Sequence, residues 1–97
     1  MSLRNKQSEF VLKMSELIQF AYAQGYTLTF GDAWAKTGHK DGSFHYNRLA
    51  IDLNLFKDGE YLDYTEDHKP LGEYWETIGG TWGGRWNDGN HYSWGEK

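Results

Sequence analysis

The chain has 97 residues, which falls within the usual range of one domain. It contains no cysteine, so disulfides and thiolate ligands are excluded, and any metal must be bound through nitrogen and oxygen atoms. The formal net charge of -4 at pH 7 argues against nucleic acid as a partner, because binding along the phosphates rests on clustered lysine and arginine.

The N-terminal residues MSLRNKQSEF lack the continuous apolar run of a secretory signal. No stretch of the chain approaches the roughly 18 apolar residues of a membrane span. We therefore expect cytoplasmic synthesis without a signal peptide, and no insertion into a membrane. No internal repeat or linker is visible, so residues 1–97 are predicted to form one domain, and we expect a monomer.

A helix is predicted over roughly residues 4–24, where apolar residues recur at spacings of three and four. Its apolar stripe comprises Phe10, Val11, Met14, Leu17, Ile18, Ala21 and Tyr22. Gly25 is the natural C-terminal stop of this helix. Residues 26–30 then alternate as a short strand, and residues 31–42, with three glycines and mixed charge, are predicted to form a loop.

A second strand is predicted over residues 48–56, where the hydrophobic pattern changes to a period of two. One face carries Leu49, Ile51, Leu53 and Leu55, and the other carries Ala50, Asp52 and Asn54. Asp52 is therefore expected to point away from the apolar face. The dipeptide Asp58-Gly59 predicts a hairpin turn, followed by a returning strand over residues 60–62.

A second helix is predicted over roughly residues 69–78, with Pro70 in its first turn and Gly79-Gly80 at its end. Its apolar stripe comprises Leu71, Tyr74, Trp75 and Ile78. The tail from Thr81 onward is expected to form a turn-rich strand or loop region. These elements predict an α+β fold in which a small, mainly antiparallel sheet is flanked by helices on one side.

Three polar residues form a candidate metal site: His45, Asp52 and His91. Two histidines and one carboxylate are a known catalytic zinc set that leaves the fourth position open for water. Asp88, three residues before His91, is the candidate for the carboxylate that transfers the water's proton. Spacing alone leaves an alternative open, because the motif H-E-x-x-H is absent and each residue singly also suits a solvent-facing strand, loop or turn position.

The short sequence segments around these residues resemble the motifs of a known family. SFHYNRLAID, residues 43–52, resembles the S-x-H-x-x-G-x-A-x-D signature of the zinc D-Ala-D-Ala carboxypeptidase and L-alanyl-D-glutamate endopeptidase family, which includes phage endolysins and shares its fold with the hedgehog signalling domain. DGNH, residues 88–91, resembles the acid-x-x-His element of that family. The segments between and after these motifs also resemble the small phage and prophage members, so the resemblance extends from about Thr29 to Trp94.

The resemblance implies a hedgehog/DD-peptidase-like fold with the metal site on the open face of the sheet. It implies that Zn2+ is bound by His45, Asp52 and His91 and that Asp88 is the catalytic base. Ser43 takes the place of the signature serine, where a supporting hydrogen bond is expected rather than nucleophilic attack, since no histidine is placed to activate it.

The sequence also departs from the family pattern. Arg48 stands where the signature most often has glycine, and Ala35 stands where many relatives have an arginine suited to stabilising an oxyanion. Lys36, Arg48 and Arg85 are candidate substitutes for that arginine. His39 is a candidate for lining the cleft, with a solvated loop position as the alternative.

Further candidates are aromatic or charged residues near the second helix and the tail. Trp82, Trp86, Tyr92 and Trp94 suit either a wall for a sugar-peptide substrate or the core, and Trp86 is the best candidate for the cleft. His68 is expected at the surface near a helix start. Glu73 and Glu76 are expected on a solvated helix face.

The expected function is that of a zinc metallopeptidase that hydrolyses peptide bonds in peptidoglycan stem peptides, in the manner of an L-alanyl-D-glutamate endopeptidase from a phage or prophage. Such an enzyme acts on the cell wall after release from the cytoplasm. One alternative is a D-Ala-D-Ala carboxypeptidase or dipeptidase. Another is a cell-wall-binding module of the same fold whose activity is weakened by the missing arginine.

Overall fold

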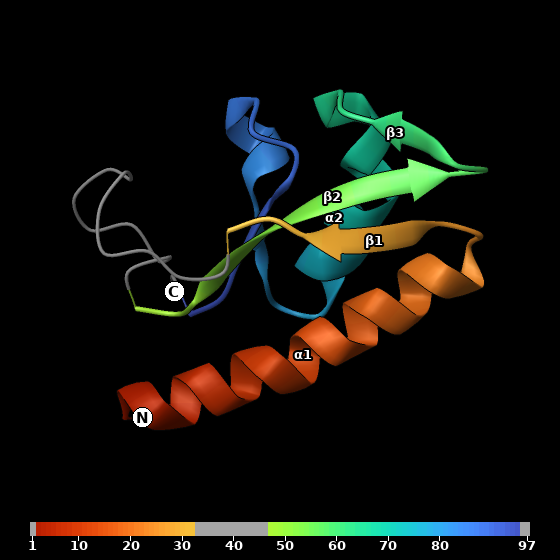
Figure 1. Cartoon of the computed structure of the whole chain (residues 1–97). Helices are drawn as coiled ribbons and strands as arrows, with labels where there is room; N and C mark the ends of the chain where they lie inside the picture. The colour runs from red at the N-terminus through yellow and green to blue at the C-terminus, as the bar shows by residue number, and fades with distance from the viewer. Residues whose placement is uncertain (1, 33–46, 96–97) are drawn as a thin grey trace.

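The computed structural model describes residues 2–32 and 47–95, which form two α-helices beside a five-stranded antiparallel sheet (Figure 1). The predicted α+β class is therefore confirmed. The site candidates Lys36, His39, Ser43 and His45 lie outside the described residues, as does most of the predicted loop over residues 31–42. Within the described ranges, neither helix has the length and apolar character needed to cross a membrane.

The first helix, α1 (Leu3–Ala23), begins after Ser2, whose hydroxyl accepts a hydrogen bond from the amide of Asn5 at 3.2 Å. Its buried residues are Phe10, Met14, Leu17 and Ala21. The apolar stripe is narrower than predicted, because the side chain of Val11 is 69% exposed and that of Tyr22 is 50% exposed. Val11 follows Phe10 directly and is therefore turned about 100° away from the core around the helix axis.

Strand β2 (Ala50–Lys57) is the longest strand and pairs with three others. It pairs with β1 (Thr27–Phe30), β3 (Glu60–Leu62) and β5 (His91–Ser93), and β5 in turn pairs with β4 (Thr81–Trp82). Asp58 and Gly59 both have positive φ, at 53° and 78°, so the predicted Asp-Gly hairpin between β2 and β3 is confirmed.

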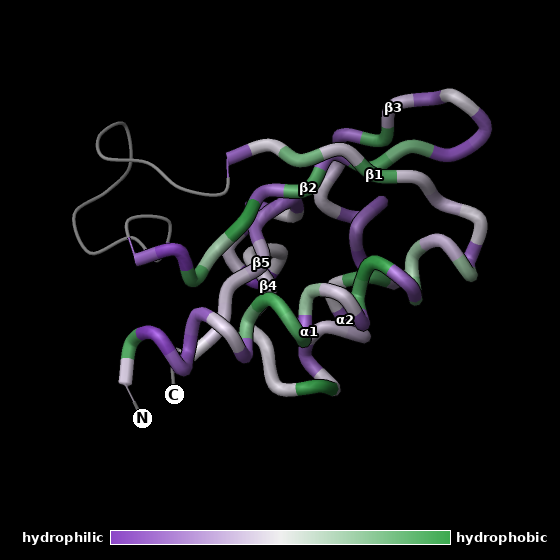
Figure 2. The backbone as a smooth tube through the Cα atoms, turned by 60° about the horizontal axis from the view of Figure 1, so that its bottom comes forward, coloured by the Kyte–Doolittle hydropathy of each residue, from purple (hydrophilic) through white to green (hydrophobic). Residues whose placement is uncertain are grey.

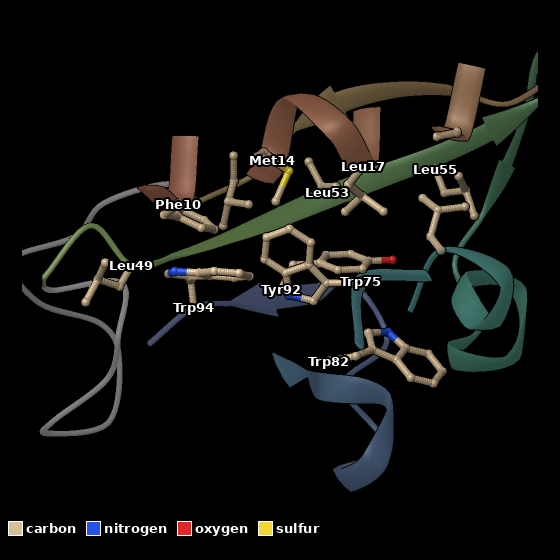
Figure 3. Packing of buried hydrophobic residues seen from close by; sticks show 13 residues of the cluster. Phe10, Met14, Leu17, Leu49, Leu53, Leu55, Trp75, Trp82, Tyr92 and Trp94 are labelled. Atoms are coloured by element: carbon tan, nitrogen blue, oxygen red, sulfur yellow. The ribbon is translucent and has the colours of Figure 1, made fainter. Parts of the chain in front are cut away.

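The core lies between the sheet and the two helices, which both lie below β1 and β2 in Figure 2. As predicted, Leu49, Ile51, Leu53 and Leu55 are buried in it. Asp52 and Asn54 alternate with them and are only half-buried. Trp75 and Tyr92 meet edge to face in the middle of this core, with ring centroids 6.4 Å apart (Figure 3). The face of β2 that carries Asp52 is therefore the one turned away from the helices.

Two short 3₁₀ helices complete the fold and flank the site. The first, η1 (Thr65–His68), leads directly into α2 (Lys69–Thr77), which has Pro70 in its first turn as predicted. The second, η2 (Gly83–Trp86), lies between β4 and β5 and ends at Asn87, whose φ of 64° is left-handed. The tail predicted as a turn-rich strand or loop is thus β4, η2 and β5.

Gly72 of α2 packs against Trp82 of the tail. A methyl group at this position would overlap the indole ring of Trp82. We expect Gly72→Ala to lower the free energy of unfolding by about 1–3 kcal/mol through overpacking, despite the higher helix propensity of alanine. Urea unfolding measures this change. Glu73→Ala, at the exposed neighbouring position, is the control and should change stability by less than about 0.5 kcal/mol, and a Gly72→Ala protein of unchanged or greater stability would contradict the expectation.

Candidate metal and catalytic site

Asp52 and His91, two of the three predicted zinc ligands, lie side by side on the open face of the sheet. The register of β2 and β5 places them directly opposite each other, so their side chains project from the same face. Asp52 Oδ1 lies 3.8 Å from His91 Nδ1, and the side chains are 22% and 14% exposed. Residues from distant parts of the sequence therefore present one oxygen and one nitrogen donor to the same partly buried space.

The backbone of Asp52 is held on the β1 side by the residues that follow β1. Gly31 N donates a hydrogen bond to Asp52 O at 2.7 Å, and Asp52 N donates to Asp32 O at 2.7 Å. A Cβ atom at Gly31 would lie only 3.1 Å from Cβ of Asp52, so the two backbones approach closely because residue 31 has no side chain. Strand β5 pairs with β2 on the other side, so the backbone of Asp52 is held by contacts on both sides.

Asp88 occupies the turn that leads from η2 into β5. Its amide donates to Gly83 O at 2.9 Å, and its carbonyl accepts a hydrogen bond from His91 N at 3.1 Å. A methyl group at Gly83 would overlap the Asp88 carbonyl and come within 2.7 Å of Cβ of His91. The side chain of Asp88 is exposed. The turn thus fixes the backbone of the predicted base relative to that of His91 and leaves the carboxylate accessible.

Of the four tail aromatics, Trp86 is the one placed at the site. Its ring centroid lies 5.7 Å from that of His91, and 53% of its side chain is exposed. Trp82, Tyr92 and Trp94 are at most 8% exposed and belong to the core. The core interpretation is therefore confirmed for Trp82, Tyr92 and Trp94, whereas the cleft role of Trp86 stays a prediction.

The two described candidate cations have different surroundings. Arg85 donates from Nε and Nη2 to the two carboxylate oxygens of Glu76 at 2.9 and 2.6 Å, and these hydrogen bonds raise the pKa of Arg85. Glu76 is therefore an ion-pair partner as well as a residue of the helix surface. Arg48 has a φ of 57° just before β2 and lines an apolar pocket with Phe10 and Met14 of α1. The roles of Arg48 and Arg85 as substitutes for the missing arginine stay predictions.

His68 is buried, so its expected surface position is wrong. Its side chain is 2% exposed, and Nδ1 lies 2.8 Å from the hydroxyl of Tyr92. Burial lowers the pKa of His68 to about 4, although Asp67 and Asp88 act in the opposite direction. Burial also raises the pKa of the Tyr92 hydroxyl. Both groups are therefore neutral at pH 7, and a hydrogen bond joins His68 Nδ1 to the Tyr92 hydroxyl.

The buried His68 predicts a loss of stability in acid. In the unfolded chain this histidine has a pKa of about 6.5, so it binds a proton at a higher pH than it does in the folded protein. The free energy of unfolding is therefore greatest above pH 6.5 and falls as the pH drops from 6.5 toward 4. We expect this residue to account for a loss of about 2 kcal/mol between pH 7 and about pH 4.5. Urea unfolding of the wild type and His68→Asn at both pH values isolates this contribution, and equal pH dependence in the two proteins would contradict it.

The donor set of the open face fits a zinc ion. Two ligands bound to tetrahedral zinc lie about 3.4 Å apart, close to the 3.8 Å between Asp52 Oδ1 and His91 Nδ1. Residues 2–32 and 47–95 contain no group of three histidine, cysteine, aspartate or glutamate side chains suited to a metal. The third predicted ligand, His45, lies outside those residues. The described part of the chain therefore supplies two donors of the predicted three.

Comparison with protein families gives a match over the second part of the chain. The model of a family described as D-alanyl-D-alanine carboxypeptidase matches residues 36–94, which is more than half of the chain. The matched segment contains all four residues predicted for the metal and the base: His45, Asp52, Asp88 and His91. A search of curated proteins found no match.

Proposed function

The chain belongs to the D-alanyl-D-alanine carboxypeptidase family of peptidases, and from this premise we propose that it is a zinc-dependent enzyme that cleaves peptidoglycan stem peptides. More narrowly, we propose an L-alanyl-D-glutamate endopeptidase of the phage or prophage endolysin type. The observation that carries the proposal is the pairing of Asp52 with His91 on the open face of the sheet, with Asp88 in the adjoining turn.

Each residue has a distinct task in this proposal. His45, Asp52 and His91 hold the metal, which when bound polarises the scissile carbonyl and lowers the pKa of the attacking water. Asp88 accepts the proton of that water and delivers it to the leaving amine, since its carboxylate is exposed beside the ligand strand. Trp86 presents an exposed ring next to His91. In this proposal a sugar-peptide substrate packs on the Trp86 ring and displaces water from it.

The proposed partner is the peptide part of peptidoglycan, which the protein meets as a monomer after release from the cytoplasm. A D-Ala-D-Ala carboxypeptidase or dipeptidase is the second candidate, because the matching family carries that description. The same metal donors and base serve either reaction. The difference between them lies in which peptide bond the cleft places over the metal.

The test is mass spectrometry of the fragments released from purified peptidoglycan by the zinc-loaded protein. Fragments with new L-alanine carboxyl termini and D-glutamate amino termini support the endopeptidase, whereas free D-alanine supports the carboxypeptidase. Both products should disappear in a chelated sample. A folded, zinc-bound protein that releases nothing would contradict the enzymatic proposal and favour a cell-wall-binding module.

A further inference from the structure

The short helix η1 contacts the segment that carries the predicted base and ligand at two points. Thr65 Oγ1 accepts a hydrogen bond from Gly89 N at 3.2 Å. His68 Nδ1 lies 2.8 Å from the hydroxyl of Tyr92. Gly89 and Tyr92 stand on either side of His91 in the sequence, so the predicted ligand lies between two residues that are each joined to η1.

The first contact requires that two backbones lie unusually close. A Cβ atom at Gly89 would be 2.5 Å from Cα of Thr65, so no other residue fits here without displacing the turn. Trp82 Nε1 donates to Gly89 O at 2.7 Å, so both polar backbone atoms of Gly89 have partners. The turn that contains Asp88 is therefore fixed between η1 and the core.

The second contact lies inside the core. His68 is 2% exposed and Tyr92 is 0% exposed, so water has no ready access to replace a lost hydrogen bond between them. Tyr92 projects to the helix side of β5, opposite to His91. A shift of the Tyr92 ring therefore moves the strand on whose other face His91 meets Asp52.

We propose that Thr65 and His68 are positioning residues, which hold residues 88–92 so that His91 stays beside Asp52 and the Asp88 carboxylate stays beside the bound peptide. This inference rests on the proposed function. Metal ligation tolerates errors of only about 0.2 Å in donor distance, so small displacements of His91 reduce zinc affinity. Catalysis is similarly sensitive, because a productive site must be held within about 0.5 Å.

Two matched pairs of variants test the proposal. Thr65→Val removes the acceptor for Gly89 N and keeps the shape of the side chain, whereas Thr65→Ser keeps the hydroxyl. His68→Leu removes the partner of Tyr92, whereas His68→Asn keeps a polar atom near the place of Nδ1. Tyr92→Phe removes the hydroxyl from the other side of the same contact, and Leu17→Val reduces core packing on α1 as a control for stability alone.

The measurements are zinc affinity, by competition with a chromogenic chelator, and kcat and KM on purified peptidoglycan, at a temperature where every variant is folded. We expect Thr65→Val, His68→Leu and Tyr92→Phe to bind zinc about 10–100-fold more weakly, as is typical when the support of a metal ligand is lost. With zinc saturating, kcat should fall about 10-fold or more while KM changes little. Thr65→Ser, His68→Asn and Leu17→Val should stay close to wild type in both measurements.

Each outcome decides the proposal. If folded Thr65→Val and Tyr92→Phe keep wild-type zinc affinity and kcat, η1 has no positioning role. If Leu17→Val loses as much as they do, the effect is one of stability and the proposal is also wrong. If the wild type binds zinc but cleaves no peptidoglycan, the proposed function fails while the zinc affinities still decide the role of η1. A wild type that binds no zinc overturns both.

Discussion

Replacing Asp88 by asparagine is expected to lower kcat for peptidoglycan cleavage about 1,000-fold, within the range that general acid-base catalysis contributes. The amide has the shape of the carboxylate but cannot accept the proton of the attacking water at neutral pH. The backbone bonds of residue 88 to Gly83 and His91 do not involve the side chain, so the turn should persist. Because the side chain is exposed, stability should change by less than about 0.5 kcal/mol.

The measurement is kcat of zinc-loaded Asp88→Asn, together with its zinc affinity and its unfolding in urea. Asp58→Asn is the matched control, since it makes the same substitution at an exposed position, in the turn between β2 and β3. Asp58→Asn should retain wild-type kcat. If Asp88→Asn keeps more than about one tenth of wild-type kcat, Asp88 is not the base, and if it loses zinc, its role is structural.

The position of Asp52 could be predicted because a strict period of two over residues 49–55 assigns every residue of the strand to a face. One apolar face must meet the core, so the carboxylate must project from the other. The helices and the Asp-Gly hairpin were predictable for a similar reason, since each depends on residues close together in the chain. Their observed bounds lie within one or two residues of those predicted.

The pairing of Asp52 with His91 could not be predicted from local pattern. Strand β5 has only three residues and follows a turn-rich segment, so it carries too short an alternation to be recognised or registered against β2. Its register depends instead on contacts made outside the strand, such as Leu53 N to Asn90 O at 2.9 Å. The family resemblance supplied the ligand role of His91 in the absence of such a pattern.

His68 shows how a residue near a helix start is misjudged. Its neighbours Asp67 and Lys69 are charged, which favours a surface position. Yet His68, Leu71 and Trp75 have the spacing i, i+3, i+7, which extends the buried stripe of α2 by one turn at its N-terminal end. Following that spacing back from α2 would have identified the histidine as a core residue. Its partner, Tyr92, comes from β5 and is beyond the reach of this pattern.

Replacing Asp52 or His91 is expected to reduce zinc affinity more than about 100-fold. Losing a residue that only supports a ligand typically reduces metal affinity about 10–100-fold, and losing the ligand itself should reduce it further. Asp52→Asn keeps the size of the side chain but replaces a charged oxygen donor by a neutral amide. His91→Ala removes the nitrogen donor and the ring next to Trp86. Peptidase activity should fall with zinc content in both variants.

Zinc content by elemental analysis and affinity by chelator competition measure the effect, with unfolding in urea to establish that each variant is folded. Asn54→Ala is the matched control, since residue 54 lies on the same face of β2 and donates to Thr29 Oγ1 at 3.2 Å. It should bind zinc as the wild type does. Because Asp52 and His91 face each other across two paired strands, a zinc affinity that survives both substitutions would mean that the metal lies elsewhere. The open face of the sheet would then have no part in the reaction.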